Sequence, residues 1–135
     1  MHCLITSMGC WVHRRSVRAQ PGLFVLSMEV LNALILQAEE EQLFLPLGNS
    51  GIIFRASFYA DDTVIFIKPA RQDLLLLLSI MEAFEQISGL RTNKEKSKAT
   101  PINCSAEETQ LAVAIFGCAV VDEIRLAVYR GICPR

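Results

Sequence analysis

The chain has 135 residues, of which 52% are hydrophobic and 20% are charged, and its net charge is −1. This length allows one domain at most. The near-neutral charge excludes a chain that binds nucleic acid through a basic field over its whole surface, so any such contact must be local. The high hydrophobic content predicts either a large buried core or a surface that a partner covers.

No segment is long and apolar enough to predict a membrane span. The most apolar stretch, residues 23–38, is interrupted by Glu29, Asn32 and Gln37, and a span needs about 20 predominantly apolar residues. The N-terminus lacks a charged region ahead of an apolar one, so a secretory signal is not expected. We therefore expect no membrane contact.

The five cysteines are scattered and odd in number, which is typical of reduced intracellular thiols and not of a disulfide framework. We therefore expect an intracellular protein, with nucleus and cytoplasm both open. His2, Cys3, Cys10 and His13 carry atoms that bind zinc. Their spacing is loose and no second compact pair follows, so surface histidines and small apolar thiols are the favoured interpretation.

Residues 1–17 show no clear period and are interpreted as an unassigned N-terminal arm. Arg14, Arg15 and Arg18 make residues 1–20 basic, and they are weak candidates for nucleic-acid contact. Charge clusters of this size are usually only solvated.

A helix is predicted from Pro21, which suits a first helical turn. Apolar residues follow at steps of three or four up to Ala38, as in a helix with a buried face. The apolar stripe is broad, so we expect burial on more than one side. Residues 39–41 are three glutamates that predict a solvent-exposed end of the helix, and they interact unfavourably with its negative terminus.

Residues 43–51 read as a connector that contains Pro46, and a β-hairpin is predicted after it. Residues 52–59 alternate in polarity, and residues 63–67 are β-branched and aromatic, so the aspartates at 61 and 62 fall at the tip. Adjacent carboxylates in a tight turn repel one another, and a pair of divalent metal ions is the usual solution. A solvated surface turn is the alternative, because aspartate is common in turns.

A second helix is predicted over residues 71–87, with Gly89 as its left-handed cap. Residues 91–98 are predicted to form a basic loop with lysines at 94, 96 and 98. In most proteins, alternating lysines in a loop only form a solvent-exposed face. Ser105 and Glu108 form a capping box that starts a third helix, which runs to about Ile115 before Gly117. In the tail, residues 119–121 and 126–129 suggest short strands.

In this order the segments resemble the palm of a reverse transcriptase of the non-long-terminal-repeat (LINE-type) retrotransposons. Residues 23–32 resemble the helix after the family's R-Q-G-x-P-L-S-P motif, and Phe58–Asp62 resembles its Y/F-A-D-D hairpin. Residues 88–97 resemble its S-G-L-x-x-N-x-x-K-S segment. More faintly, residues 116–118 and 129–132 resemble its L-G-C and Y-L-G-I/L-P segments. Only the hairpin and the S-G-L segment are specific, and only in combination.

The resemblance spans residues 18–132, with 133–135 as a tail, and implies an α+β fold. This would be a fragment of a polymerase palm, with an antiparallel β-hairpin packed by two or three helices. The implied activity is RNA-directed DNA polymerisation, in which two Mg²⁺ (or Mn²⁺) ions assist attack of a primer hydroxyl on a deoxynucleotide. RNA template, DNA primer and deoxynucleotides are the implied partners.

The same resemblance implies roles for individual residues. Asp61 would be the principal metal ligand, with Asp62 beside it, and both would be catalytic. Tyr59 would lie beside the primer terminus, and Ala60 would keep the turn small. Lys96 would be the basic residue near the triphosphate. Lys94 is a further weak candidate for nucleic-acid contact.

The chain departs from the family pattern in two places. The family's chemistry needs another carboxylate on a strand upstream, but Asp61 is the first aspartate of the chain. The R-Q-G-x-P-L-S-P loop is shortened to residues 18–22, so Gln20 is not assigned its role. With the first metal-ligand motif and the fingers missing, we expect the chain to be inactive alone, with doubtful metal occupancy and a need for the missing reverse-transcriptase segments. The alternatives are a non-catalytic module that binds nucleic acid or another partner, and a relic without function.

Overall fold

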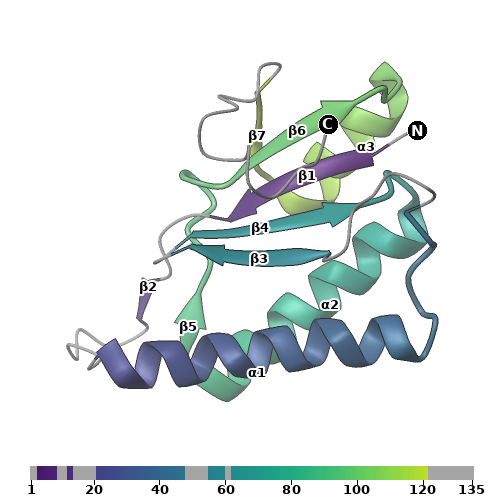
Figure 1. Cartoon of the computed structure of the whole chain (residues 1–135). Coiled ribbons are helices and arrows are strands. Elements are labelled where there is room, and N and C mark those ends of the chain that lie inside the picture. The colour runs from purple at the N-terminus through teal and green to yellow at the C-terminus, as the bar shows by residue number, and fades with distance from the viewer. Residues whose placement is uncertain (1–2, 9–11, 14–20, 48–54, 60–61, 122–135) are drawn as a thin grey trace.

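The computed structural model describes residues 3–8, 12–13, 21–47, 55–59 and 62–121. Within these ranges the chain forms three helices and seven strands (Figure 1). In chain order they are β1 (Cys3–Met8), β2 (Val12–His13), α1 (Pro21–Glu40), β3 (Ala56–Tyr59), β4 (Asp62–Ile67), α2 (Arg71–Ser88), β5 (Leu90–Arg91), β6 (Lys98–Ile102), α3 (Ala106–Phe116) and β7 (Ala119–Val120). The predicted mixed α+β class is confirmed.

Five strands form the main sheet in the order β3-β4-β1-β6-β7, and β2 pairs with β5 in a separate small sheet. β1 is central and runs antiparallel to both β4 and β6, whereas β7 runs parallel to β6. The succession β1-α1-β3-β4-α2-β6 is a β-α-β-β-α-β arrangement in which β4 of the hairpin and β6 flank β1, and β3 lies outside β4. The N-terminal residues therefore supply the strand that joins the hairpin to the rest of the sheet.

Neither β1 nor β6 was predicted. β1 has the sequence Cys-Leu-Ile-Thr-Ser-Met, which shows no polar alternation, and its place depends on pairing with strands about 60 and 95 residues further along the chain. β6 contains Pro101, which argues against a central strand because proline has no N–H to donate. Since β7 pairs only with Lys98 and Ala99, Pro101 is bordered by β1 alone. The basic loop is accordingly shorter than predicted, because Arg91 and Lys98 belong to strands.

The three predicted helices are confirmed, together with their caps. Gly89 ends α2 with φ 74° and donates its N–H to the Glu85 carbonyl, and Gly117 ends α3 with φ 66°. Both positive φ values suit glycine at a helix C-terminus. Ser105 and Glu108 form the capping box. No helix in the described part of the chain is long and apolar enough to cross a membrane.

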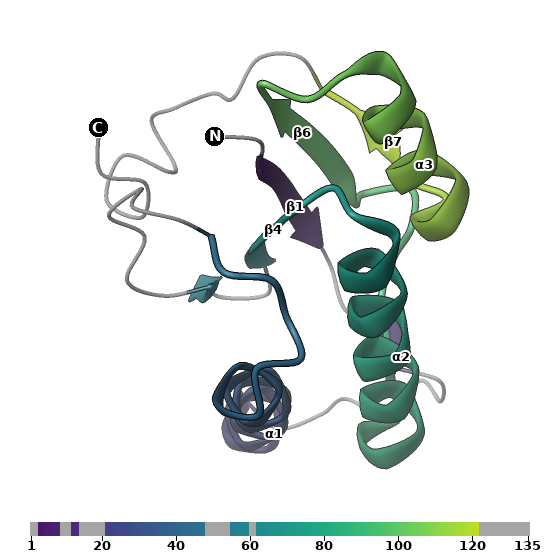
Figure 2. The same ribbon diagram turned by 90° about the vertical axis from the view of Figure 1, so that its right-hand side faces the viewer.

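The helices cover one face of the sheet, and the core lies between the helices and that face (Figure 2). α1 contributes a single stripe to this core, made of Met28, Leu31, Ile35 and Ala38. The expectation that α1 is buried on more than one side is wrong for this chain, because Leu26 on the opposite side is 63% exposed. The other core residues come from β4, β6, α2, α3 and the connectors, and they include Ile65, Leu74, Leu77, Phe84, Ala99 and Phe116.

A buried polar network joins the base of the hairpin to α1. Arg55 is 5% exposed, and its guanidinium donates to Glu39 Oε1 at 2.7 Å and to the carbonyls of Phe66 and Leu45 at 3.0 Å each. It also lies over the Phe44 ring, 4.3 Å from the centroid. Because its partners come from α1, the connector and β4, Arg55 fixes three segments that are far apart in sequence.

Asp73 extends this network to α2. It is fully buried in the first turn of that helix and accepts the backbone N–H of Leu45 at 3.1 Å and 3.3 Å. Burial raises the pKa of the Asp73 carboxyl, while the Leu45 hydrogen bond and the attraction of Arg55 oppose that shift. The connector at Leu45 is therefore held by Arg55 at its carbonyl and by Asp73 at its N–H.

Candidate active-site hairpin

The predicted hairpin is confirmed as β3 and β4, which pair antiparallel from Ala56↔Ile65 to Tyr59↔Asp62. Only two residues, Ala60 and Asp61, separate the last residue of β3 from the first of β4, and both lie outside the described residues. For Tyr59 and Asp62 the description covers the backbone. The register therefore brings the start of β4, where Asp62 stands, to one end of the sheet.

The end of β1 lies beside that tip. Met8 pairs with Thr63, and Ser7 pairs with Val64 on one side and with Lys98 of β6 on the other. The tip of the hairpin, the C-terminal end of β1 and the first residue of β6 thus meet at the same end of the sheet (Figure 1). Adjacent strands are about 4.8 Å apart, so β6 begins about 10 Å from β4.

The divalent metal pair that the resemblance implies would draw its oxygen ligands from this end of the sheet. Within the described ranges, no three His, Cys, Asp or Glu side chains are grouped so that they could hold a metal ion. The neighbouring strands, β1 and β6, contain no carboxylate. The donors that the resemblance names are Asp61 and Asp62 of one hairpin, and their side chains lie outside the described part of the chain. Mg²⁺ prefers several oxygen ligands in octahedral geometry, and two-metal sites hold both ions between such ligands.

Thr63, next to Asp62, is fully buried, and its Oγ1 has no hydrogen-bond partner among the described residues. A buried hydroxyl without a partner costs about 1–3 kcal/mol. Such groups are uncommon in folded chains and concentrate where a structure is not optimised for stability alone. The unpaired hydroxyl therefore marks this end of β4 as a position where stability is not maximised.

The first residues of the S-G-L-x-x-N-x-x-K-S segment form the C-terminal end of α2. Ser88 Oγ donates to the Phe84 carbonyl at 2.7 Å and accepts the N–H of Leu90 at 3.1 Å. Gly89 provides the left-handed cap, and Leu90 is 4% exposed in the core. Each residue of the S-G-L triplet thus has a structural reason that does not depend on a ligand.

Asn93 organises the rest of the segment into a turn. Its carbonyl accepts the N–H groups of Lys96 and Ser97 at 3.2 Å and 3.0 Å and the hydroxyl of Ser97 at 2.8 Å. Its side-chain Oδ1 accepts the N–H of Glu95 at 3.1 Å. The asparagine and the second serine of the motif are therefore explained by turn geometry, and the lysines remain for other roles.

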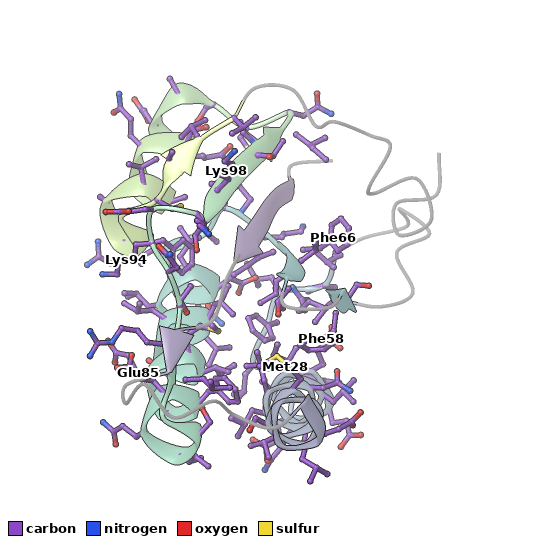
Figure 3. The ribbon with its side chains drawn as sticks, turned by 90° about the vertical axis from the view of Figure 1, so that its left-hand side faces the viewer. Met28, Phe58, Phe66, Glu85, Lys94 and Lys98 are labelled. Carbon is purple, nitrogen blue, oxygen red and sulfur yellow. The ribbon has the colours of Figure 1, made fainter. Side chains whose placement is uncertain are left out.

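The three lysines are exposed but lie in different settings. The stem of Lys94 passes beside the C-terminus of α3, where a Cβ added to Gly117 would lie 4.0 Å from Lys94 Cδ. A lysine is favourable there because the last helical carbonyls are partly negative. Lys96 lies on the turn, and Lys98 is held in β6 at the end of the sheet that includes the hairpin tip (Figure 3).

A groove of about 460 Å³ lies between α2 and the start of the basic loop. Across it Arg91 Nε donates to Glu85 Oε1 at 3.1 Å. Acidic side chains line the helix side and basic ones the loop side, so the groove has no net charge of one sign. Its lining residues are Leu78, Met81, Glu82, Glu85, Arg91, Thr92 and Lys94.

The structure brings some of the predicted site residues together and leaves others undescribed. Tyr59 and Asp62 flank the tip, so Asp62 belongs to β4 and not to the turn in which it was predicted, whereas Lys94 and Lys96 lie on a separate turn after β5. Arg14, Arg15 and Arg18 lie outside the described residues, as do His2 and Cys10 of the rejected zinc pattern. Sequence reasoning missed Lys98 as a site candidate, and the only signal for it was the alternation of lysines at 94, 96 and 98. A scan against protein-family models found no match for this chain.

Proposed function

We propose that the chain derives from the palm of a reverse transcriptase of the non-long-terminal-repeat retrotransposon kind. The observation that carries the proposal is the β3–β4 hairpin with Tyr59 opposite Asp62, set beside the end of a strand that comes earlier in the chain. A polymerase of this class needs carboxylates on such a hairpin and on such a neighbouring strand. The order of the three helices around the hairpin supports the same origin.

The chain is proposed to lack polymerase activity by itself. β1 occupies the place beside the tip from which a further carboxylate would have to come, and it ends in Thr-Ser-Met. A hydroxyl can bind Mg²⁺ but does not supply the negative charge of a carboxylate, and a thioether is too soft a ligand for Mg²⁺. Loss of one charge-stabilising group typically lowers a rate by about 10²–10³-fold. The loss of a metal ligand should be at least as severe.

A second candidate function, binding of nucleic acid without catalysis, is favoured by Lys98. Strand residues alternate between faces, and cross-strand partners share a face. Val64, Ser7 and Lys98 form one such row, so position 62 is expected on the same face as Lys98. This arrangement suits a local phosphate contact near the tip, in a chain whose overall charge is close to neutral.

Primer extension on an RNA template, with Mg²⁺ and then Mn²⁺, tests the proposed inactivity. The full-length chain is expected to incorporate no deoxynucleotide, and circular dichroism on the same sample should show that it is folded. Asp61→Asn is the control. Incorporation that this substitution abolishes would mean that a carboxylate elsewhere completes the metal site, and the proposal of inactivity would then be wrong.

Fluorescence anisotropy with a labelled RNA–DNA duplex tests the binding function. Lys98→Gln should weaken binding and lower the slope of log affinity against log salt by about one. The matched control is Arg71→Gln, an exposed cation at the start of α2, which follows the opposite end of β4. Equal effects of the two substitutions, or no binding at low salt, would refute a phosphate contact at the hairpin end of the sheet.

A further inference from the structure

The side of α1 that faces away from the core carries apolar side chains between Glu29, Gln37 and Glu40. Leu26 is 63% exposed, Leu36 is 44% exposed and Val30 is 38% exposed, and Ala33 between them is exposed as well. Residues three and four apart lie next to each other on a helix, so these side chains form one continuous strip. α1 runs along the lower edge of the molecule in Figure 1, and no described element lies beyond it.

The charged residues at the C-terminal end of α1 interact unfavourably with the dipole of the helix. Its first turn contains no acidic residue and its last turn no basic one. Glu40 and Glu41 are instead exposed at the C-terminal end, where the helix is already partly negative. A neighbouring helix that ran in the opposite direction would place its positive N-terminus beside these carboxylates.

The central outward residues of α1 are also complementary to themselves. Residues at equal distances from Ala33, one toward each end of the helix, would face each other across an antiparallel crossing. Val30 then faces Leu36 and Glu29 faces Gln37, whereas further out Leu26 faces Glu40. Two copies of the helix crossing antiparallel at Ala33 would therefore match apolar with apolar side chains at the centre and an amide with a carboxylate beside it. Alanine at the crossing lets the two backbones approach closely.

We propose that the outward face of α1 is a docking surface for a second copy of this chain, and that two α1 helices pack antiparallel about a two-fold axis at Ala33. Each copy presents the same patch, so the contact is isologous and closes at a dimer. Glu40 and Glu41 of each copy then lie near the first turns of the partner helix. One helix per subunit buries less area than a standard interface, so the dimer is a weak, concentration-dependent one.

Sedimentation velocity over a concentration series of the full-length chain tests the dimer. A monomer–dimer equilibrium is expected, and Leu36→Lys should weaken it by at least about tenfold, because it sets a charge against the partner's Val30. Ile87→Lys on α2 is the matched control, since Ile87 is 65% exposed, and it should leave the equilibrium unchanged. A chain that stays monomeric, or larger aggregates that respond equally to both substitutions, would overturn the proposal.

Glu40→Lys tests the antiparallel direction through two effects of opposite sign. Within one chain the lysine suits the negative end of α1, so the thermal stability of the monomer should rise. In the dimer the same lysine would face the positive N-terminus of the partner helix, so the dimer should weaken. A monomer stabilised by this substitution together with an unchanged or stronger dimer would rule out antiparallel packing.

Discussion

Replacing Arg55 with methionine is expected to destabilise the chain by about 3–5 kcal/mol, because it removes a charged donor from two backbone carbonyls and from the face of an aromatic ring. Methionine keeps an unbranched apolar stem of similar length, so the change removes mainly the guanidinium. That group is held in a position that is 5% exposed. Its loss leaves the carbonyls of Leu45 and Phe66 and the carboxylate of Glu39 without their donor.

The magnitude follows from the individual contacts. Each hydrogen bond from the charged guanidinium to a carbonyl contributes about 1.5–3 kcal/mol, and the contact with the Phe44 ring adds about 0.5–1 kcal/mol. The pair with Glu39 counts for less than about 1 kcal/mol, because the side chain of Glu39 is 32% exposed and water screens it. Water that binds to the Leu45 carbonyl in the variant recovers part of the lost free energy. Domains are stable by only about 5–15 kcal/mol, so the loss is a large fraction of the total.

Urea unfolding followed by far-ultraviolet circular dichroism measures this loss, with the slope of free energy against denaturant checked for constancy. The double substitution Arg55→Met with Glu39→Leu is the informative comparison. Its stability should lie within about 1 kcal/mol of that of Arg55→Met alone, because water solvates the Glu39 carboxylate once its partner is removed. A loss below about 1 kcal/mol for Arg55→Met, or a larger difference between the double and the single variant, would refute this account of the network.

Three further substitutions test local features of the fold. Ser105→Ala should cost about 1 kcal/mol by removing the capping box, measured by thermal unfolding, whereas Ser79→Ala on the exposed face of α2 should cost nothing measurable. Thr63→Val should raise the free energy of unfolding by about 1 kcal/mol, since it removes a buried hydroxyl that has no partner among the described residues; a lower stability would mean that the hydroxyl is satisfied in solution. Burial raises the pKa of Asp73 above its unfolded value of about 3.8, so its contribution to stability is greatest below that value and falls as pH rises through the folded pKa. Asp73→Asn should remove that fall, and unfolding series that keep the same pH dependence in both proteins would contradict it.

The helices were predictable because their signals are local. The left-handed glycine at 89, the capping box at Ser105 and the apolar spacing of residues 21–38 each act within a few residues of the chain, and each corresponds to a bond or angle in the structure. The hairpin was predictable for the same reason, because two residues connect strands of alternating or β-branched composition. Local signals of this kind need no knowledge of the rest of the fold.

The rest of the sheet was not predictable from such signals. β1 joins the sheet through pairing with strands far along the chain, and Pro101 in β6 is tolerated only because β7 stops at the second residue of that strand. Arg55 was read as one residue of an alternating strand, and its burial depends on a carbonyl of the connector and a carboxylate of α1. These features are set by tertiary contacts, which periodicity does not encode.

The candidate site shows the same division between local and non-local information. The two aspartates and the turn at Asn93 depend on residues that are adjacent in sequence. On the proposed reverse-transcriptase origin, a two-metal site would need in addition a carboxylate from another strand, and here the strand beside the tip ends in Met8. Since β1 pairs through its backbone, the sheet forms whether or not that end carries a ligand. On that proposal, the chain would keep the frame and the most recognisable motif of a polymerase without the ligand that this strand would supply.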